Sequence, residues 1–210
     1  MLRFNSLKKE YSTTTVLHVP SLVIQNGTIL LQGENGSGKT TFLKIIAGLL
    51  PFEGDIFIDD LFSLKKQRQS FIRNITYAEA EPLYPPFLTA KELVRLFCYV
   101  KRGNIKDIEA LLQQLHLFGV YTKAVSTYSS GMLKKLSLAL AFAGSPKWIL
   151  LDEPLITIDK NAVETICDII NNKSKAGISF IITSHQHFTE GLLSFSSVLR
   201  AANKTITIVE

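Results

Sequence analysis

Hydrophobic and polar positions along this chain change their period several times. Four segments in the first part either alternate apolar and polar residues or concentrate β-branched ones, which predicts strands. These segments are residues 15–23, 28–32, 55–58 and 72–77. Asn26-Gly27, between the first two, predicts a hairpin turn. After Lys39, apolar residues recur every three or four positions, which predicts a helix that ends at Pro51.

The remainder of the chain is mostly helical before it returns to buried strands. Three prolines within residues 81–86 exclude regular structure there, because each removes a backbone donor and fixes φ. Thr89 and Glu92 form a capping box, which predicts the start of a helix. Further helices are predicted at about 105–116, from Ser130 to before Pro146 and at about 160–175, and strands at 148–151 and 178–183.

This order of elements predicts an α/β fold with three parts. A mainly parallel sheet with helices forms a core lobe at residues 1–81 and 146–210, and an antiparallel β region lies at its N-terminal end. Residues 82–145 form an inserted α-helical subdomain. We therefore expect one domain of two lobes across residues 1–210.

The segment from Gly33 to Thr40, GENGSGKT, fits the P-loop pattern G-x-x-x-x-G-K-[ST] between a predicted strand and a predicted helix. Glycines allow backbone N–H groups to surround a β-phosphate, and the helix N-terminus adds positive potential. In such a loop Lys39 reaches the β- and γ-phosphates, and the Thr40 hydroxyl binds Mg²⁺. The sequence therefore predicts a P-loop NTPase core with a nucleotide and Mg²⁺ as cofactors.

A second part of the site is predicted where the apolar strand at 148–151 ends. Asp152 is expected near the Mg²⁺, and Glu153 is expected to orient or deprotonate the attacking water. The alternative is a strand that acidic residues terminate before Pro154. His185 follows another core strand, where it would hydrogen-bond the γ-phosphate; the alternative is an ordinary surface histidine.

Taken in this order, the motifs resemble those of the ATP-binding cassette (ABC) ATPases. The resemblance covers essentially the whole chain. It runs through the P-loop, the signature segment YSSGM from Tyr128 to Met132, the Asp152-Glu153 pair, Asp159 and His185.

Several roles follow from the resemblance alone. Such subunits bind ATP, dimerise head to tail, and hold each ATP between the P-loop of one subunit and the signature of the other. Here Ser129 and the N–H of Gly131 would face the γ-phosphate in the opposite subunit, and Asp159 would support the interface. Tyr11 lies at about the family's spacing for the aromatic residue that stacks on adenine; the alternative is an exposed N-terminal tyrosine.

The candidate residues fall into three groups. The catalytic candidates are Glu153, His185 and Lys39, and the metal ligands are Thr40 and Asp152. The nucleotide contacts are Tyr11, Gly33, Glu34, Asn35, Gly36, Ser37, Gly38, Lys39, Thr40, Thr41, Ser129, Ser130, Gly131 and Asp159.

Two motifs depart from the family pattern. Ala80 stands where the family usually has a glutamine, and it can neither bind Mg²⁺ nor hold a water; Glu79 or Glu81 would replace the glutamine only if the loop shifts by one residue. Ser130 replaces the first glycine of the usual Leu-Ser-Gly-Gly-Gln signature, and Tyr128 and Met132 differ from it as well. If that position needs a positive φ, the side chain costs on the order of 1 kcal/mol. Both departures predict slower or altered hydrolysis.

Composition limits which partners and which cellular location we expect for the chain. The net charge of +5 over 210 residues is too small to indicate nucleic-acid binding, and we expect no nucleic-acid partner. Cys98 and Cys167 lack metal-site spacing and are expected to be buried free thiols. No segment reaches the roughly 18 apolar residues of a membrane span. The resemblance then implies a peripheral position on the cytoplasmic face of the cell membrane, beside a separate transmembrane permease and a second ATPase subunit.

Three classes of function are open. The resemblance implies an ATPase subunit of an ABC transporter, with export of a peptide or bacteriocin-like substrate favoured because the chain is near the family's minimum length. The alternative is a regulatory nucleotide-binding subunit with weak hydrolysis, which Ala80 and the altered signature favour and Glu153 opposes. A cassette protein of ribosomes or DNA repair is disfavoured by length, which leaves no room for a second cassette or a long coiled-coil insert. Whether the dimer is homomeric or heteromeric stays open.

Overall fold

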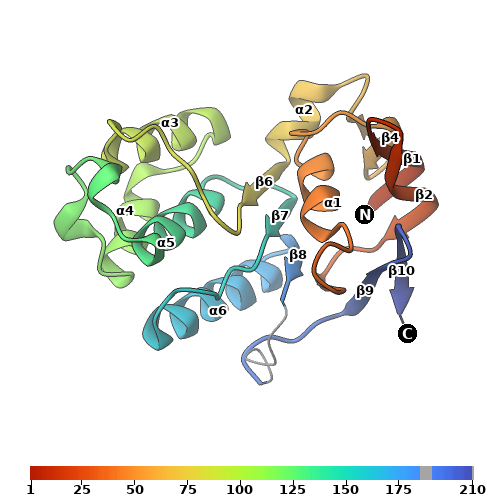
Figure 1. Cartoon of the computed structure of the whole chain (residues 1–210). Coiled ribbons are helices and arrows are strands. Elements are labelled where there is room, and N and C mark those ends of the chain that lie inside the picture. Colours follow the sequence, from red (N-terminus) through yellow and green to blue (C-terminus); the bar gives the residue numbers. More distant parts are fainter. Residues whose placement is uncertain (185–190, 210) are drawn as a thin grey trace.

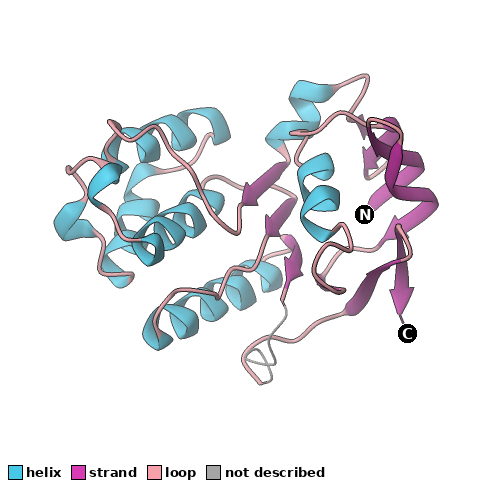
Figure 2. Cartoon of the chain, in the orientation of Figure 1, coloured by secondary structure: helices cyan, strands magenta, loops and turns pink. Residues whose placement is uncertain are grey.

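Two sheets with different strand directions form the core of the chain (Figure 2). The computed structural model describes residues 1–184 and 191–209. The antiparallel N-terminal sheet has the order β2-β1-β4-β5, with β1 (Leu2–Tyr11), β2 (Thr14–Ile24), β4 (Glu53–Ile58) and β5 (Phe62–Ser63). The central sheet has the order β10-β9-β3-β8-β7-β6, with β3 (Thr28–Gln32), β6 (Ile75–Ala78), β7 (Trp148–Leu151), β8 (Ser179–Thr183), β9 (Ser197–Ala202) and β10 (Thr205–Val209). Its described pairs are parallel except β9 with β10.

The helices occupy distinct positions around the central sheet (Figure 1). Near the N-terminal sheet lie α1 (Lys39–Ile46), which follows β3, and the short α2 (Arg68–Arg73), which precedes β6. Between β6 and β7 the chain forms a group of helices, α3 (Ala90–Lys101), α4 (Ile105–Gln114) and α5 (Ser130–Ala141), with 3₁₀ turns at Phe118–Val120 and Val125–Thr127. The long α6 (Lys160–Lys175) connects β7 to β8.

Strand β7 is buried on both faces, and successive residues join different cores. Trp148 and Leu150 belong to the cluster that includes Phe42 of α1 and the N-terminal sheet. Ile149 and Leu151 belong to the cluster formed with the helices on the other face. This double burial explains the uninterrupted apolar sequence of β7, which is typical of central parallel strands. It also fixes the end of β7, where the polar residues begin.

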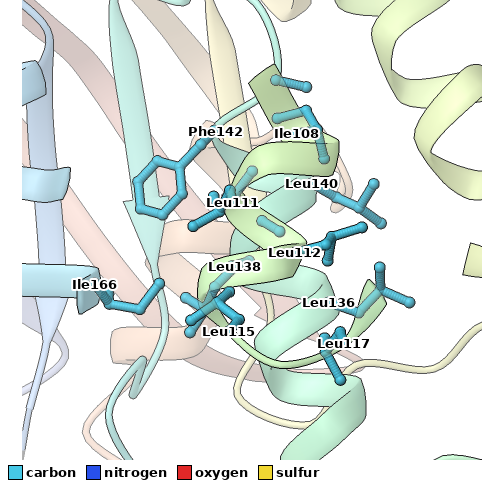
Figure 3. Packing of buried hydrophobic residues seen from close by; sticks show 14 of the residues in the cluster. Ile108, Leu111, Leu112, Leu115, Leu117, Leu136, Leu138, Leu140, Phe142 and Ile166 are labelled. Atoms are coloured by element: carbon cyan, nitrogen blue, oxygen red, sulfur yellow. The ribbon is translucent and has the colours of Figure 1, made fainter. Parts of the chain in front are cut away.

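The helical group has its own apolar packing (Figure 3). Side chains of α4 and the segment after it face those of α5 across the interface. The labelled residues are Ile108, Leu111, Leu112, Leu115, Leu117, Leu136, Leu138, Leu140, Phe142 and, from α6, Ile166. Because α5 also contacts β6, it joins the helical group to the central sheet.

The observed architecture confirms the predicted fold class: a P-loop core with a mainly parallel sheet, an N-terminal antiparallel region and inserted helices. The capping box of α3 has both of its hydrogen bonds. Both Cys98 and Cys167 are buried free thiols, as expected. Within residues 1–184 and 191–209, no helix is long and apolar enough to cross a membrane. The lobe boundaries at 82 and 145 stay a prediction.

Three local predictions were wrong. Asn26-Gly27 does not close a hairpin, because β2 and β3 belong to different sheets and the chain passes from one to the other there. Ile72 lies in α2 rather than in a strand, and β6 begins only at Ile75. Helix α1 ends at Ile46, before the left-handed Gly48, rather than continuing to Pro51.

Candidate active site

The P-loop curves between the end of β3 and the start of α1, as its glycines allow. Gly36 and Gly38 have φ values of 78° and 100°, in the left-handed region that other residues rarely adopt. A Cβ on Gly33 would approach the backbone oxygen of Ala201 to 2.5 Å, so only glycine packs the loop against β9. Gly38 is the N-cap of α1 and offers no side-chain cap, which leaves the first N–H groups of the helix available to an anion.

Lys39 lies in the first turn of α1 and folds back over the loop. Its Nζ donates to the carbonyl oxygens of Gly33 at 2.7 Å and Glu34 at 3.0 Å, which uses two of its three N–H groups. Burial lowers the pKa of Lys39, while the charges of Glu153 and Asp152 act in the opposite direction. Lys39 lines the same cleft as Asp152 and Glu153, which follow β7.

Asp152 is buried at the end of β7 and held by two hydroxyl groups. The Thr183 hydroxyl donates to its Oδ1 at 2.7 Å, and the Tyr77 hydroxyl donates to its Oδ2 at 3.2 Å. Burial, followed by the charge of Asp152, raises the pKa of Tyr77 far above its usual range, so this group remains a donor. The two bonds fix the carboxylate in one orientation.

Glu153 has a left-handed backbone, with φ of 47°. For a residue other than glycine this conformation costs of order 1–3 kcal/mol. The Thr183 hydroxyl accepts a 2.7 Å hydrogen bond from the Glu153 N–H, so one hydroxyl contacts both acidic residues. Sequence reasoning missed Thr183. The available signal was its place at the end of β8, whose parallel register puts Ile182 opposite Leu151.

A cleft of about 750 Å³ brings most of the predicted residues together. Its walls come from the P-loop and α1, the segment after β6, the start of α5, and the segment after β7. The lining includes Asn35, Gly36, Gly38, Lys39, Thr40, Thr41, Ala80, Glu81, Ser130, Leu133, Asp152, Glu153 and Thr157. A second hollow beside it, near the β9–β10 turn, is lined by Gly33, Glu34 and Ser37.

Other predicted residues lie outside the cleft. Tyr11 is half exposed near the β1–β2 turn, and the Lys9 ammonium lies 4.4 Å from its ring centroid, so a cation already covers one ring face. Asp159 is the N-cap of α6 and forms an ion pair with Lys135. The hydrogen bond from Lys135, and then the one from the Ala162 N–H, lowers the pKa of Asp159. His185 lies outside the described residues.

The signature segment forms the start of α5. Ser129 is the N-cap, and its hydroxyl accepts a 3.2 Å hydrogen bond from the Met132 N–H. Ser130 is the first residue of the helix and does not have a positive φ, so the conditional strain does not arise there. A Cβ on Gly131 would lie 2.6 Å from the Thr157 carbonyl oxygen, which explains the glycine at that position. The roles of Ser129 and Gly131 toward a second subunit stay predictions.

The loop after β6 contains Ala80, and its backbone is held from α5. The Nζ of Lys134 donates to the carbonyl oxygens of Glu79 at 2.7 Å, Ala80 at 3.0 Å and Asp152 at 2.7 Å. Burial lowers the pKa of Lys134 to about 8. Glu79 forms an ion pair with Lys44 at 3.4 Å, whereas Glu81 lines the cleft. Of the two acidic neighbours of Ala80, only Glu81 therefore faces the site.

The donor set in the cleft fits a nucleotide with Mg²⁺. Thr40 and Asp152 both line the cleft. Their hydroxyl and carboxylate groups are hard oxygen donors, which are the ligands that Mg²⁺ prefers. The uncapped start of α1 and the Lys39 ammonium suit phosphate oxygens. A Cβ on Gly36 would meet no atom within 4 Å, so the loop leaves open space on that side.

The family model described as ABC transporter matches residues 17–156, which is two thirds of the chain. The chain belongs to the ABC transporter ATPase family. The matched range runs from β2 through the P-loop and the signature to the segment after Asp152-Glu153. The suspected resemblance is thereby confirmed.

Relatives and solved structures extend the match across the chain. An uncharacterized ABC transporter ATP-binding protein of Bacillus subtilis, YybJ, is 33% identical over 210 residues, covering 97% of this chain and 93% of the relative. The lantibiotic transport ATP-binding protein SrtF of Streptococcus pyogenes is 29% identical over 187 residues, covering 88% and 80%. The fold matches a dimeric post-hydrolysis structure of the ATP-binding cassette MJ0796 bound to ADP and Pi, with a TM-score of 0.83 at 20% identity, covering 100% of this chain and 98% of that one.

Proposed function

We propose that this ABC cassette binds and hydrolyses ATP to power a separate transmembrane permease. The observation that carries the proposal is the single cleft that holds the P-loop lysine, a hydroxyl and a carboxylate suited to Mg²⁺, and Glu153. Lys39 and the start of α1 bind the phosphates, and Thr40 and Asp152 hold the metal. Bound Mg²⁺ supplies charge neutralisation at the β- and γ-phosphates.

Glu153 is the residue that we assign to the attacking water. Its backbone is fixed by the Thr183 hydroxyl, and its side chain lines the cleft beside Asp152. A carboxylate in that place orients the attacking water and accepts its proton. His185 is proposed to contact the γ-phosphate, and Ser129 with the Gly131 N–H to contact the nucleotide of a second subunit. Asp159 supports that interface, and Tyr11 is the proposed adenine platform.

A regulatory subunit with weak hydrolysis is the second candidate, and Ala80 favours it. The alanine lines the cleft without any side-chain group for a metal or water. Glu153 and the ordered Asp152 carboxylate favour turnover instead. The two candidates differ in one measurable property, because a regulatory subunit would bind ATP without Glu153-dependent hydrolysis.

The substrate class follows from similarity rather than from the site. A lantibiotic transport protein is among the relatives, which favours export of a peptide or bacteriocin-like substrate. We place the chain peripherally on the cytoplasmic face of the cell membrane, with a permease and a second ATPase subunit as partners. A groove of about 270 Å³ is the proposed permease contact, with Leu49, Ile72 and Phe97 in its lining. Leu49 is 56% exposed there, which suits an apolar partner.

The substitution Leu49→Glu tests the permease contact. The fraction of the chain that stays with washed membranes of its own cells should fall at least about fivefold, because a charge in an apolar interface costs several kcal/mol. Hydrolysis by the purified chain should stay within about twofold, because Leu49 does not line the nucleotide cleft. Leu61→Glu is the matched control, since Leu61 is also an exposed leucine but lies outside the groove. Equal membrane retention of Leu49→Glu and wild type would exclude this surface.

A further inference from the structure

Lys134 carries an ionisable ammonium group in an unusually buried place. It lies on α5 with an exposed fraction of 1%. Burial of an ammonium group is expensive unless its protons are paired. The three N–H groups of Lys134 donate to three backbone carbonyl oxygens, so its donor capacity is filled. This full pairing of its donors indicates that Lys134 has a role beyond filling the core.

The acceptors of Lys134 begin where the ladder between β6 and β7 ends. The parallel register of the two strands runs to Ala78 opposite Leu151, and the Asp152 N–H donates to the Ala78 carbonyl oxygen at 3.0 Å. Beyond that bond both chain segments line the cleft, with Ala80 on one and Asp152 on the other. Lys134 bonds the next carbonyl oxygens on both segments, those of Glu79 and Ala80 on one and that of Asp152 on the other.

The other end of the same side chain belongs to the helical group. Helix α5 packs against α4 through the leucines that Figure 3 displays. One turn before Lys134, Ser130 lines the cleft, and so does the neighbouring Leu133. Lys134 thus joins three parts of the site: the start of α5, the Ala80 loop and the Asp152 segment.

The acidic residues around Lys134 also suit a lysine at this buried position. Burial lowers the pKa of Lys134, and the carboxylates of Asp152, Glu153, Glu79 and Glu81 act in the opposite direction and favour its ammonium form. None of the three bonds goes to a carboxylate, so Lys134 does not compete with the two hydroxyl groups that hold the Asp152 side chain. The lysine therefore offsets the negative charge of the site without occupying a metal ligand.

We propose that Lys134 is a positioning residue that ties the Ala80 loop and Asp152 to α5, so that the metal site moves with the inserted helices as one unit. The proposal rests on the proposed function, because it is as the Mg²⁺ ligand that the position of Asp152 matters. It gives α5 of the same chain a role in ordering a loop that lacks the family's glutamine.

Hydrogen exchange of the nucleotide-free protein tests whether Lys134 holds the Ala80 loop against α5. In Lys134→Met, the backbone amides of residues 79–81 and 83 should exchange at least about tenfold faster than in wild type, because opening of this loop no longer breaks the two bonds from Lys134 to Glu79 and Ala80. Lys101→Met is the matched control. Lys101 is a lysine with a pKa that burial also lowers to about 8, and its Nζ donates to the carbonyl oxygens of Ile72 and Ile75 at 2.7 and 2.6 Å, outside that loop. In this control, exchange at the same amides should stay within about twofold of wild type.

The Mg²⁺ dependence of hydrolysis tests whether Lys134 also positions the proposed Mg²⁺ ligand Asp152. The half-saturating Mg²⁺ concentration should rise about tenfold or more in Lys134→Met, as happens when outer partners of metal ligands are removed, and should be unchanged in Lys101→Met. ATP binding in EDTA should be unchanged in both variants. The proposal is overturned if either the exchange or the Mg²⁺ dependence of Lys134→Met matches wild type. If Lys134→Met does not fold, Lys134→Gln, which keeps two donors, carries the same two measurements. A wild-type protein without hydrolysis would reject the proposed function alone, because the exchange measurement does not depend on turnover.

Discussion

Thr183 is the residue on which the two acidic groups of the site converge. Its hydroxyl donates to Asp152 and accepts from the Glu153 N–H. Asp152 and Glu153 could be predicted from a local pattern, because both follow an apolar strand directly. Thr183 could not, because it lies some thirty residues further along the chain and only the register of β7 with β8 brings it beside them.

Replacement of Thr183 by valine removes this hydroxyl without changing the shape of the side chain. Asp152 loses a donor and the partly buried Glu153 N–H loses its acceptor, so the free energy of unfolding should fall by about 1–3 kcal/mol. Hydrolysis should fall at least about tenfold, because the Asp152 carboxylate is no longer fixed. Thr183→Ser keeps the hydroxyl and should retain most of the hydrolysis. Denaturant unfolding and steady-state hydrolysis measure the two effects, and full hydrolysis in Thr183→Val would contradict this role.

Helix α5 begins within the signature segment, which is one of the two motifs of the site that depart from the family pattern. Its start and end were predictable from the signature and from Pro146, and its N-cap follows the serine preference at that position. Its position against the segment after β7 was not predictable, because it depends on a close approach of Gly131 to Thr157. The same limit explains the errors at Asn26-Gly27 and at Ile72. A turn signal does not specify which sheet receives the next strand, and α2 is too short to show a helical period.

Substitution Gly131→Ala tests that close approach. The new Cβ would lie 2.6 Å from a backbone oxygen, so α5 must shift, and overpacking of this kind lowers the free energy of unfolding by about 1–3 kcal/mol. Hydrolysis should fall as well, because Ser130 and Leu133 of the same helix line the cleft. Gly119→Ala is the control, since a Cβ there meets no atom within 4 Å. Equal stability of Gly131→Ala and Gly119→Ala in thermal unfolding would contradict the packing argument.

At the scale of the whole molecule, the cleft is assembled from segments that the sequence separates widely. The central sheet brings the P-loop after β3 and the acidic pair after β7 to the same edge, as parallel strands of this class do. The motif order was enough to predict the family, the α/β class and the phosphate-binding loop. It could not predict the hydrogen bonds of Lys134. A lysine in an amphipathic helix is normally expected to face solvent, and only the structure shows that this one is buried.

ATP hydrolysis by wild type and Glu153→Gln tests the central claim most directly. The amide keeps the shape of the side chain but cannot accept a proton, so Mg²⁺-dependent hydrolysis should fall at least about 100-fold. ATP binding should stay within about threefold, because Lys39 and the start of α1 are unchanged. The measurement uses the purified chain, alone and with its membrane partner. Strong loss of hydrolysis with retained binding is the predicted result, and equal residual hydrolysis in the two proteins would contradict the assignment of this chain as an ATPase.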